Sequence, residues 1–253
     1  MVEKILIDAL ILAGAPSDIQ IDAENKYNSR AMIPINGKSM LNWVAEALNA
    51  SSSIGKIAVI GYVESELIDI IIPPKGSLVE NIKSGAQYFP DAQYILIVCS
   101  DIPMLTPESI DDFILQALES KSEMAYPIID KSYCLEKYPD MKRTYVTTAD
   151  GIFTGGNMVL LSKDFIQNNW HIISDAYNAR KHPVQLARLI GMGVLFKVLL
   201  GKFIPSILKI SYLEKSVSKM MSAKVKAIVS KYPEIGEDID KASDIEAAKK
   251  YLK

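Results

Sequence analysis

The feature of the sequence that most constrains the fold is a short apolar run followed closely by a carboxylate. Residues 94–99 (Tyr-Ile-Leu-Ile-Val-Cys) show no polar alternation and are too few for a typical helix. Such a run predicts a strand buried on both faces, as the central strands of a parallel sheet are. Asp101 follows the run, and Pro103 then prevents the strand from continuing.

The position of Asp101 has two interpretations. In an open α/β sheet the ligand binds beyond the carboxyl ends of the strands, where a carboxylate is a suitable ligand for a hard divalent cation. Aspartate is also common in turns, because its side chain hydrogen-bonds to nearby backbone groups. This stretch alone does not separate a metal ligand from a turn residue.

Predicted strands and helices alternate along most of the chain. This alternation is typical of the α/β class, with a mostly parallel central sheet and helices on both faces. Thr106, followed by a proline, is the expected N-cap of one helix, and Ser243 that of another near the C-terminus. The strands are predicted at 5–12, 57–60, 67–72, 94–99, 144–148, 158–161 and 224–229, and the first helices at 39–48, 78–87 and 107–118.

The chain of 253 residues is expected to form a single domain. Residues 1–161 form the predicted α/β core. Residues 162–253 form a mainly helical extension that returns to the core at about 224–253. We find no internal repeat and no low-complexity linker.

Composition excludes some functions. The net charge is −2 and there is no long block of one sign, which argues against a nucleic-acid-coating protein and against a polybasic membrane tail. The N-terminus leads directly into a predicted strand without the features of a signal peptide, so we expect a cytoplasmic protein. One of the two cysteines, Cys99, lies in the predicted buried strand and is expected to behave as a small apolar residue.

Residues 189–200 are strongly apolar but too few to span a bilayer, which takes about 20 residues. A buried helix, a subunit contact and a cover over a substrate pocket are the expected alternatives. An interfacial membrane helix is the remaining one.

Two glycine-containing segments fail the best-known nucleotide-binding patterns. Gly37-Lys38-Ser39 lacks the earlier glycine of a P-loop, because position 32 is Met32. Gly14 has no partner glycines at the spacing of a dinucleotide-binding fingerprint. The small residues around Gly14 nevertheless allow a backbone turn to approach a ligand closely.

Two further segments have both a binding and a structural interpretation. The start of the helix at Gly76-Ser77, with Lys75 beside it, offers backbone amides to the polar edges of a ligand, or is simply a Ser-capped helix. Gly156 and Asn157 precede a buried strand, where the backbone either lies against a bulky ligand or forms a bulge or turn.

Carboxylates are found in two places that suit a metal site, at Asp101 and at Asp238 and Asp240. Mg²⁺ is typically held by one or two carboxylates, with substrate phosphates and water completing its coordination. Phosphoryl or nucleotidyl transfer suits such a site, because the protein then mainly positions the reactants and neutralises charge.

These segments carry a family resemblance. Leu12-Ala13-Gly14 and the run 28–41 are similar to the opening signature of NTP transferases, and the similarity continues through most of the chain. The pattern resembles that of the MobA-like NTP transferase family, typified by molybdenum-cofactor guanylyltransferase, with a GT-A-type, Rossmann-like fold. The later matches are Gly76-Ser77, Asn81, Ser100-Asp101-Ile102-Pro103, Gly155-Gly156-Asn157 and Asp238-Ile239-Asp240.

The resemblance implies transfer of NMP from an NTP to a phosphorylated small-molecule acceptor, with release of pyrophosphate and with Mg²⁺ or Mn²⁺ as cofactor. Arg30 matches the phosphate-binding lysine of the signature, with Lys26 as an alternative, and Ala15 stands where the signature has a second glycine. The residues implied are Arg30, Lys26 and Asp101 as catalytic; Leu12, Ala13, Gly14, Ala15, Lys75, Gly76, Ser77, Asn81 and Ser100 as nucleotide-binding; Gly156 and Asn157 as acceptor-binding; and Asp101, Asp240 and Asp238 as metal ligands.

Two other functions remain open from the sequence. One is a nucleotide-sugar glycosyltransferase of the same fold. The other is a non-catalytic nucleotide-binding protein, suggested by Ala15 and Arg30. The expected partners are an NTP and a phosphorylated acceptor, without nucleic acid or stable membrane insertion, and a homodimer is possible. The base, the acceptor and the oligomeric state are not identified by the sequence.

Overall fold

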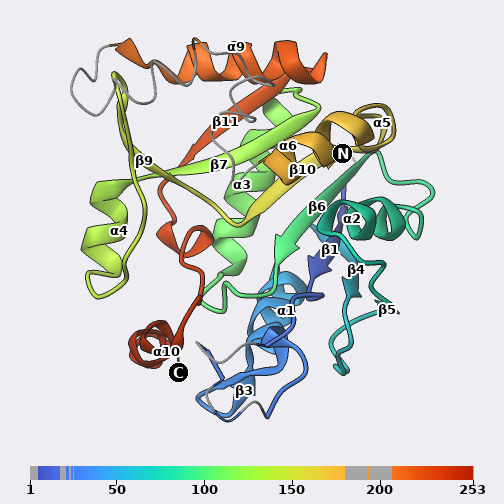
Figure 1. Ribbon diagram of the computed structural model, residues 1–253, viewed down its shortest axis with the longest axis vertical. Helices are drawn as coiled ribbons and strands as arrows, with labels where there is room; N and C mark the ends of the chain where they lie inside the picture. Colours follow the sequence, from blue (N-terminus) through green and yellow to red (C-terminus); the bar gives the residue numbers. More distant parts are fainter. Residues whose placement is uncertain are drawn as a thin grey trace.

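The computed structural model describes residues 5–17, 21, 22, 24, 26–179, 193 and 207–252. These residues form one central sheet with helices against both of its faces (Figure 1). In the described part of the chain the sheet has nine strands, which are β1 (Ile7–Leu12), β4 (Ile54–Ile60), β5 (Ile70–Ile72), β6 (Tyr94–Cys99), β7 (Met124–Asp130), β8 (Val146–Thr148), β9 (Gly151–Gly155), β10 (Met158–Ser162) and β11 (Val225–Ser230).

The strand order is β5-β4-β1-β6-β10-β7-β9-β8, and β11 pairs with β7. Strand β1 pairs in parallel with both β4 and β6, β4 with β5, and β11 with β7. Strand β10 runs antiparallel between β6 and β7, and β9 is antiparallel to β7 and β8. The prediction of an α/β fold with a mostly parallel sheet is confirmed.

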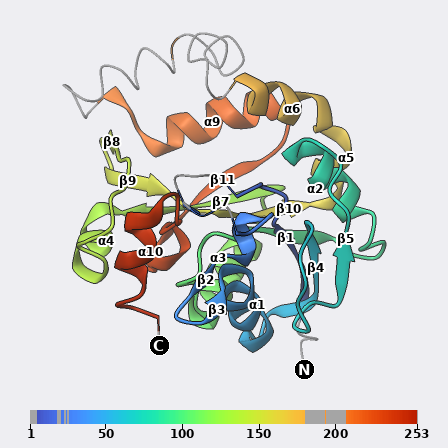
Figure 2. The same ribbon diagram turned by 60° about the horizontal axis from the view of Figure 1, so that its bottom comes forward.

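Helices cover both faces of this sheet, as expected. Figure 2 shows α2, α5, α6 and α9 on one face and α1 and α3 on the other. The α-helices of the described residues that carry the argument are α1 (Met40–Ala50), α2 (Leu78–Ala86), α3 (Pro107–Glu119), α4 (Lys131–Lys137), α5 (Lys163–Asn168), α6 (Trp170–Ala179), α9 (Ile210–Met221) and α10 (Ala242–Ala248).

The central strand β6 has the predicted bounds and is buried on both faces. Leu96 and Val98 belong to the core formed with α1 and α3. Ile95 and Ile97 belong to the core formed with α2, α5 and α9. Full burial of each aliphatic side chain stabilises the fold by about 1.5–3 kcal/mol, so this strand is a main source of stability and a rigid support for the residues that follow it.

One predicted helix cap is confirmed and one is wrong. Thr106 Oγ1 accepts the Ser109 amide N–H at 3.3 Å, with Pro107 at the first position of α3. Helix α10, however, begins at Ala242. The carboxylate of Asp244 accepts the amide N–H groups of the two residues before the helix, each at 3.1 Å. An acidic side chain inside the first turn therefore takes the role predicted for Ser243.

Helix α4 and strand β9 are among the elements that were not predicted. Helix α4 has seven residues and buries mainly Cys134, so its apolar periodicity is weak. Strand β9 starts at Gly151, whose φ of 145° favours glycine, directly after a turn. Its residues pair with β7 and β8, a long-range contact that no local pattern reveals.

The C-terminal segment, residues 225–252, returns to the sheet and to the hairpin of residues 34–39. Strand β11 pairs with β7 along its whole length. Helix α10 then packs against the hairpin of β2 (Pro34–Ile35) and β3 (Lys38–Ser39), where Asn36 Nδ2 donates to the Lys249 and Leu252 carbonyls at 3.0 and 2.7 Å. The division into a core and an extension stays a prediction.

None of the described helices is both long enough and apolar enough to cross a membrane. Except for Gly193, the apolar stretch 189–200 lies outside the described residues, and so do the predictions made for it.

Candidate active site

The carboxyl ends of β1 and β6 form the centre of the site. The two strands pair in parallel as far as Leu12 and Cys99, and the Ser100 amide N–H donates to the Leu12 carbonyl at 3.3 Å. Asp101 therefore lies beside the segment that leaves β1 toward Gly14. This is the edge at which open α/β sheets bind their ligands.

Backbone contacts fix the segment after β1. The Ala13 amide N–H donates to the Ile60 carbonyl at 2.8 Å, and Ser29 Oγ donates to the Ala13 carbonyl at 3.1 Å. The Arg30 amide N–H donates to the Ala15 carbonyl at 3.2 Å. Arg30, the first residue of the short 3-10 helix η1 (Arg30–Met32), is thereby held close to the end of β1.

Arg30 connects the two predicted carboxylate groups. Its Nη2 donates to Asp240 Oδ1 at 2.9 Å, and its Nη1 lies 3.9 Å from Asp101 Oδ2. The Ile239 amide N–H donates to the Asp101 carbonyl at 2.9 Å, which holds the C-terminal segment against the end of β6. The fold thus brings together three charged residues from distant parts of the sequence.

Three buried polar atoms of this region have no hydrogen-bond partner among the described residues. They are Asp101 Oδ1, Arg30 Nε and Arg143 Nε. Burial raises the pKa of Asp101, an effect that Arg30 opposes and Asp240 reinforces. Buried groups of this kind are completed by a ligand, an ion or water, so the cluster has the chemistry of a binding site.

Asp238 has a different partner from Asp240. Its Oδ1 forms an ion pair with Arg143 Nη1, and Arg143 Nη2 lies 3.4 Å from the Gly155 carbonyl oxygen. The Arg143 side chain is only 13% exposed. Asp240 therefore faces Asp101 across Arg30, whereas the charge of Asp238 is balanced by Arg143.

Gly156 and Asn157 lie between the end of β6 and the C-terminal segment. The Asn157 amide N–H donates to the Ile235 carbonyl at 2.8 Å, and Nδ2 donates to the Gly236 carbonyl at 3.2 Å. A Cβ at position 156 would lie 2.7 Å from Ile235 and from Pro127, so only glycine fits there. Both residues have a clear structural role in addition to their place at the edge of the site.

The predicted nucleotide side is built around Gly14. A Cβ at this position would lie 3.2 Å from Asn81 Nδ2, and Asn81 Oδ1 accepts the Lys75 amide N–H at 2.6 Å. The end of β1, the turn at Lys75 and helix α2 therefore meet at one place.

The start of α2 is not a set of free amides. The Ser77 amide N–H donates to Glu80 Oε2 at 2.9 Å, and the Glu80 amide N–H donates to Ser77 Oγ at 3.2 Å. This reciprocal capping satisfies two of the donors that were predicted to face a ligand. Gly76 precedes the cap with a φ of 86°, a conformation that favours glycine.

Lys26 does not share the position of Arg30. Its side chain is 63% exposed and forms an ion pair with Glu24. Among the described residues no hydrogen bond or ion pair joins it to Asp101 or Asp240. Of the two cations that the sequence left open, the structure places Arg30 against the aspartates.

A polar cavity of about 400 Å³ opens beside the cluster. It contains both acidic and basic side chains, and the basic ones suit an anionic group. Its lining residues are Tyr126, Lys142, Arg143, Thr144, Thr154, Gly155, Gly156, Asn157, Asp238, Asp240, Lys241 and Asp244.

The basic residues of this cavity and one buried acid were not predicted. Lys142 and Arg143 follow α4 in a segment whose sequence is only generally charged, and Lys241 precedes α10. Glu237 is fully buried beside Cys134 and Arg143, and burial raises its pKa to about 7. The proximity of Lys142 and Arg143 to Asp238 depends on long-range packing, although this adjacent basic pair was a signal available in the sequence.

The structure of a hypothetical transferase from Thermus thermophilus is similar over nearly the whole chain. It has a TM-score of 0.84 and 30% sequence identity, with coverage of 95% of this chain and 100% of that one. CMP:2-keto-3-deoxy-manno-octonic acid synthetase, solved with CTP, has a TM-score of 0.58, 10% identity and 98% coverage of both chains. 2-C-methyl-D-erythritol 4-phosphate cytidylyltransferase, also from Thermus thermophilus, has a TM-score of 0.54 and 10% identity, covering 95% of this chain and 96% of that one.

The fold is that of the nucleotidyltransferases among these neighbours. The sequence pattern of the MobA-like NTP transferase domain matches residues 9–191. The chain belongs to this family, as the resemblance predicted. No curated protein matches the sequence.

Proposed function

We propose that the protein transfers NMP from an NTP to the phosphate of a small-molecule acceptor and releases pyrophosphate, with Mg²⁺ as cofactor. One observation carries the proposal: Arg30, Asp101 and Asp240 converge at the ligand-binding edge of the sheet, and Asp240 also lines the neighbouring polar cavity. Family membership supports nucleotidyl transfer in general. The acceptor and the metal are the parts proposed here.

In this mechanism the NTP lies along the segment after β1. Gly14 allows the close approach, and Asn81 and the backbone near Lys75 bind the base and ribose. Arg30 then offsets the charge that develops on the leaving pyrophosphate. Because the guanidinium presents several donors in a fixed plane, it suits a phosphate group.

The acceptor phosphate binds in the polar cavity, where Lys142, Arg143 and Lys241 supply positive charge. One of its oxygens attacks the α-phosphorus, and the bond from the α-phosphorus to the oxygen that bridges to the β-phosphorus breaks. The electrons of that bond leave with pyrophosphate. An acceptor phosphate is already ionised at neutral pH, so the protein needs no general base.

The residues present fit a magnesium ion. Asp101 Oδ1 is buried without a partner, and Asp240 faces it across Arg30. Two carboxylates suffice when phosphates and water complete the coordination. When bound, Mg²⁺ neutralises the phosphates and orients them.

The first test is thermal unfolding with ATP, CTP, GTP or UTP, each with and without Mg²⁺. Stabilisation by a nucleotide that requires Mg²⁺ and is lost in Asp101→Asn would support the site. Asp140→Asn is the matched control, because Asp140 is an exposed aspartate whose partner is Lys250. Absence of any nucleotide-dependent shift would overturn the proposal.

Product analysis provides the second test. Pyrophosphate released in the presence of a phosphorylated acceptor is the expected product. Release of a nucleoside diphosphate would favour the glycosyltransferase interpretation. Binding without any product would favour a nucleotide-binding protein that does not catalyse transfer.

A further inference from the structure

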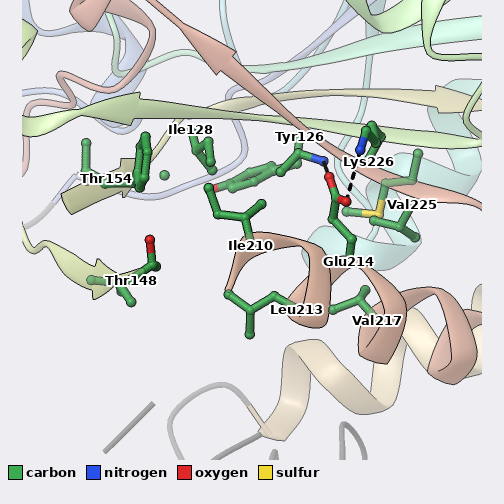
Figure 3. Close-up of a pocket in the computed structure, with 15 residues that line it drawn as sticks. Tyr126, Ile128, Thr148, Thr154, Ile210, Leu213, Glu214, Val217, Val225 and Lys226 are labelled. Carbon is green, nitrogen blue, oxygen red and sulfur yellow. Dashed lines mark hydrogen bonds and ion pairs between the residues drawn. The ribbon is translucent and has the colours of Figure 1, made fainter. Parts of the chain in front are cut away.

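A second cavity, which the proposed mechanism does not use, lies between α9 and the sheet (Figure 3). Its volume is about 320 Å³ and its walls are almost entirely apolar. The residues that line it are Met124, Tyr126, Ile128, Val146, Thr148, Phe153, Thr154, Gly155, Ile210, Leu213, Glu214, Val217, Val225, Lys226 and Ala227.

Helix α9 is tied to the rest of the molecule at both ends of this cavity. At its start, the Ile210 amide N–H donates to Asp150 Oδ2 at 2.8 Å. Near its end, the Val225 amide N–H donates to Ser218 Oγ at 3.0 Å. The space between the helix and the strands is therefore a partly open pocket bounded by fixed elements, and it is not the result of a loosely attached helix.

The charged residues of the cavity are already paired. Lys226 Nζ lies 3.0 Å from Glu214 Oε2, and Glu214 Oε1 accepts the Ala227 amide N–H at 3.0 Å (Figure 3). These contacts leave little charge to attract a polar ligand. The remaining walls suit an aliphatic group.

The apolar cavity shares three wall residues with the polar cavity of the active site, namely Tyr126, Thr154 and Gly155. The Tyr126 ring lines the apolar side, and its hydroxyl donates to the Gly156 carbonyl at 2.8 Å on the polar side. In Figure 3 the hydroxyl end of this ring points toward Thr154. The two cavities therefore lie on either side of a wall formed by these residues, and a ligand with an anionic head and an apolar chain would reach both where it passes the Tyr126 ring.

We propose that the apolar cavity holds the aliphatic chain of the acceptor, so that the acceptor is an amphiphilic phosphate. The inference rests on the proposed function, because that function places the acceptor phosphate in the polar cavity. A dry cavity of about 150 Å³ holds one benzene molecule, so a volume of about 320 Å³ corresponds to a chain of roughly a dozen carbons.

The test is calorimetric titration of the full chain with linear alkyl monophosphates, from ethyl to decyl phosphate, below their micelle-forming concentrations. Affinity is expected to rise by up to about fourfold for each methylene group that becomes buried. Equal affinity for ethyl and decyl phosphate would overturn the inference. Equal affinity for decanol and decyl phosphate would overturn the link to the polar cavity.

Two matched substitutions on β11 locate the binding. Ala227→Phe fills the cavity and is expected to weaken decyl phosphate binding at least tenfold while leaving ethyl phosphate unchanged. Val229→Phe places the same side chain two residues away, at an exposed position outside the cavity lining, and is expected to change neither. If Ala227→Phe does not fold, Leu213→Ser, on α9, makes the same wall polar and is expected to weaken decyl phosphate selectively. If Ala227→Phe and Val229→Phe change the decyl phosphate affinity equally, the chain does not bind in this cavity. The same conclusion follows if Leu213→Ser leaves the decyl phosphate affinity unchanged.

Pyrophosphate assays separate this inference from the proposed function. Faster release with decyl phosphate than with ethyl phosphate supports both. Equal release with the two phosphates retains the proposed function and overturns the inference. Binding that depends on chain length, without release from any NTP, overturns the transfer reaction and retains the cavity as the site of an amphiphilic phosphate.

Discussion

The two halves of the sheet contribute different kinds of group to the active site. Apart from Arg30 and Asp101, which lie where the two halves meet, the half formed by β5, β4, β1 and β6 contributes backbone groups and small residues, such as Gly14 against Asn81. The half formed by β10, β7, β9, β8 and β11, with the segments that connect them, contributes charged side chains, such as Arg143. The shape of the backbone therefore limits which ligands fit beside β1, whereas the charge of the side chains limits which ligands bind in the polar cavity.

In the proposed reaction, the first half of the sheet binds the nucleotide and the second half binds the acceptor. A nucleotide presents the same ribose and phosphates whatever its base, so a fixed backbone cradle suits it. Acceptors differ among the enzymes of this fold, and side chains on loops change more readily than a parallel strand pair buried on both faces. The comparison leads to four predictions.

The largest effect is expected where the two halves meet. Asp101→Asn removes a carboxylate from the end of β6 while keeping its shape. We expect pyrophosphate release to fall by about a hundred- to a thousandfold, the range for loss of one electrostatic contact in a transition state. Steady-state kinetics checks this, with Asp140→Asn as the exposed control. A loss of less than about tenfold would mean that Asp101 serves the turn rather than the reaction.

A stability difference is expected between the two glycines that flank the site. Gly156→Ala forces a Cβ to within 2.7 Å of Ile235 and Pro127, and overpacking of this kind costs about 1–3 kcal/mol. Gly14→Ala approaches only the end of the Asn81 side chain, at 3.2 Å, and should cost less than about 1 kcal/mol while weakening NTP binding. Urea unfolding measures both. Equal costs would show that the acceptor half is less tightly packed than the structure indicates.

A crossed pair of substitutions directly tests this separation of nucleotide binding from acceptor binding. Asn81→Ala should raise the KM for the NTP about tenfold, since it removes the side chain that holds the Lys75 backbone. Arg143→Met should raise the KM for the acceptor by a similar factor, because it removes a cation from the polar cavity. Each substitution should leave the other KM within about twofold. If both substitutions change the same KM, the nucleotide and the acceptor do not bind to separate halves of the sheet.

The sequence reveals elements with a strong local pattern better than elements held by long-range pairing. Strand β6 was predicted with its observed bounds because an apolar run ending at Asp101 and Pro103 is a local signal. Helix α4 and strand β9 were not predicted, because one buries little and the other is held by pairing across the sheet. Strands β10 and β11 of the second half were predicted to within one residue, whereas the predicted starts of β4 and β5 in the first half were three residues off, so the misses follow weak local patterns and not one half of the sheet.

The site follows the same rule. Asp101 and Asp240 were predicted as partners from spaced motifs, and the structure brings both to Arg30. The sequence did not choose between Lys26 and Arg30, because that choice depends on how a polar loop folds back. Arg143 was missed since its partner Asp238 lies far along the chain. The roles of these residues in catalysis, the cytoplasmic location and the possible homodimer stay predictions.

The smallest effect is expected at a contact in the first half that lies outside both cavities. Asp111 of α3 accepts hydrogen bonds from Ser51 Oγ at 2.6 Å, Ser52 Oγ at 2.8 Å and the Ser53 amide N–H at 3.0 Å. Burial acts to raise its pKa, but these hydrogen bonds outweigh burial and bring the pKa to about 2, from an ordinary value of 3.8.

Because this pKa is lower in the folded state, the contact stabilises the fold above pH 3.8 and its contribution is lost as the pH falls toward 2. Asp111→Asn should therefore lower the free energy of unfolding by about 1 kcal/mol at pH 7, a modest value because the group is partly exposed. The difference from wild type should shrink below pH 4. Urea unfolding between pH 3 and 7 measures it, with the neighbouring Asp112→Asn, which loses only a contact to Gln116, as control. Turnover should not change, because the contacts of Asp111 with residues 51–53 lie apart from Gly14 and Asn81, where the nucleotide is proposed to bind. A loss of turnover at unchanged stability would contradict this prediction. It would show that α3 influences the active site through Asp101.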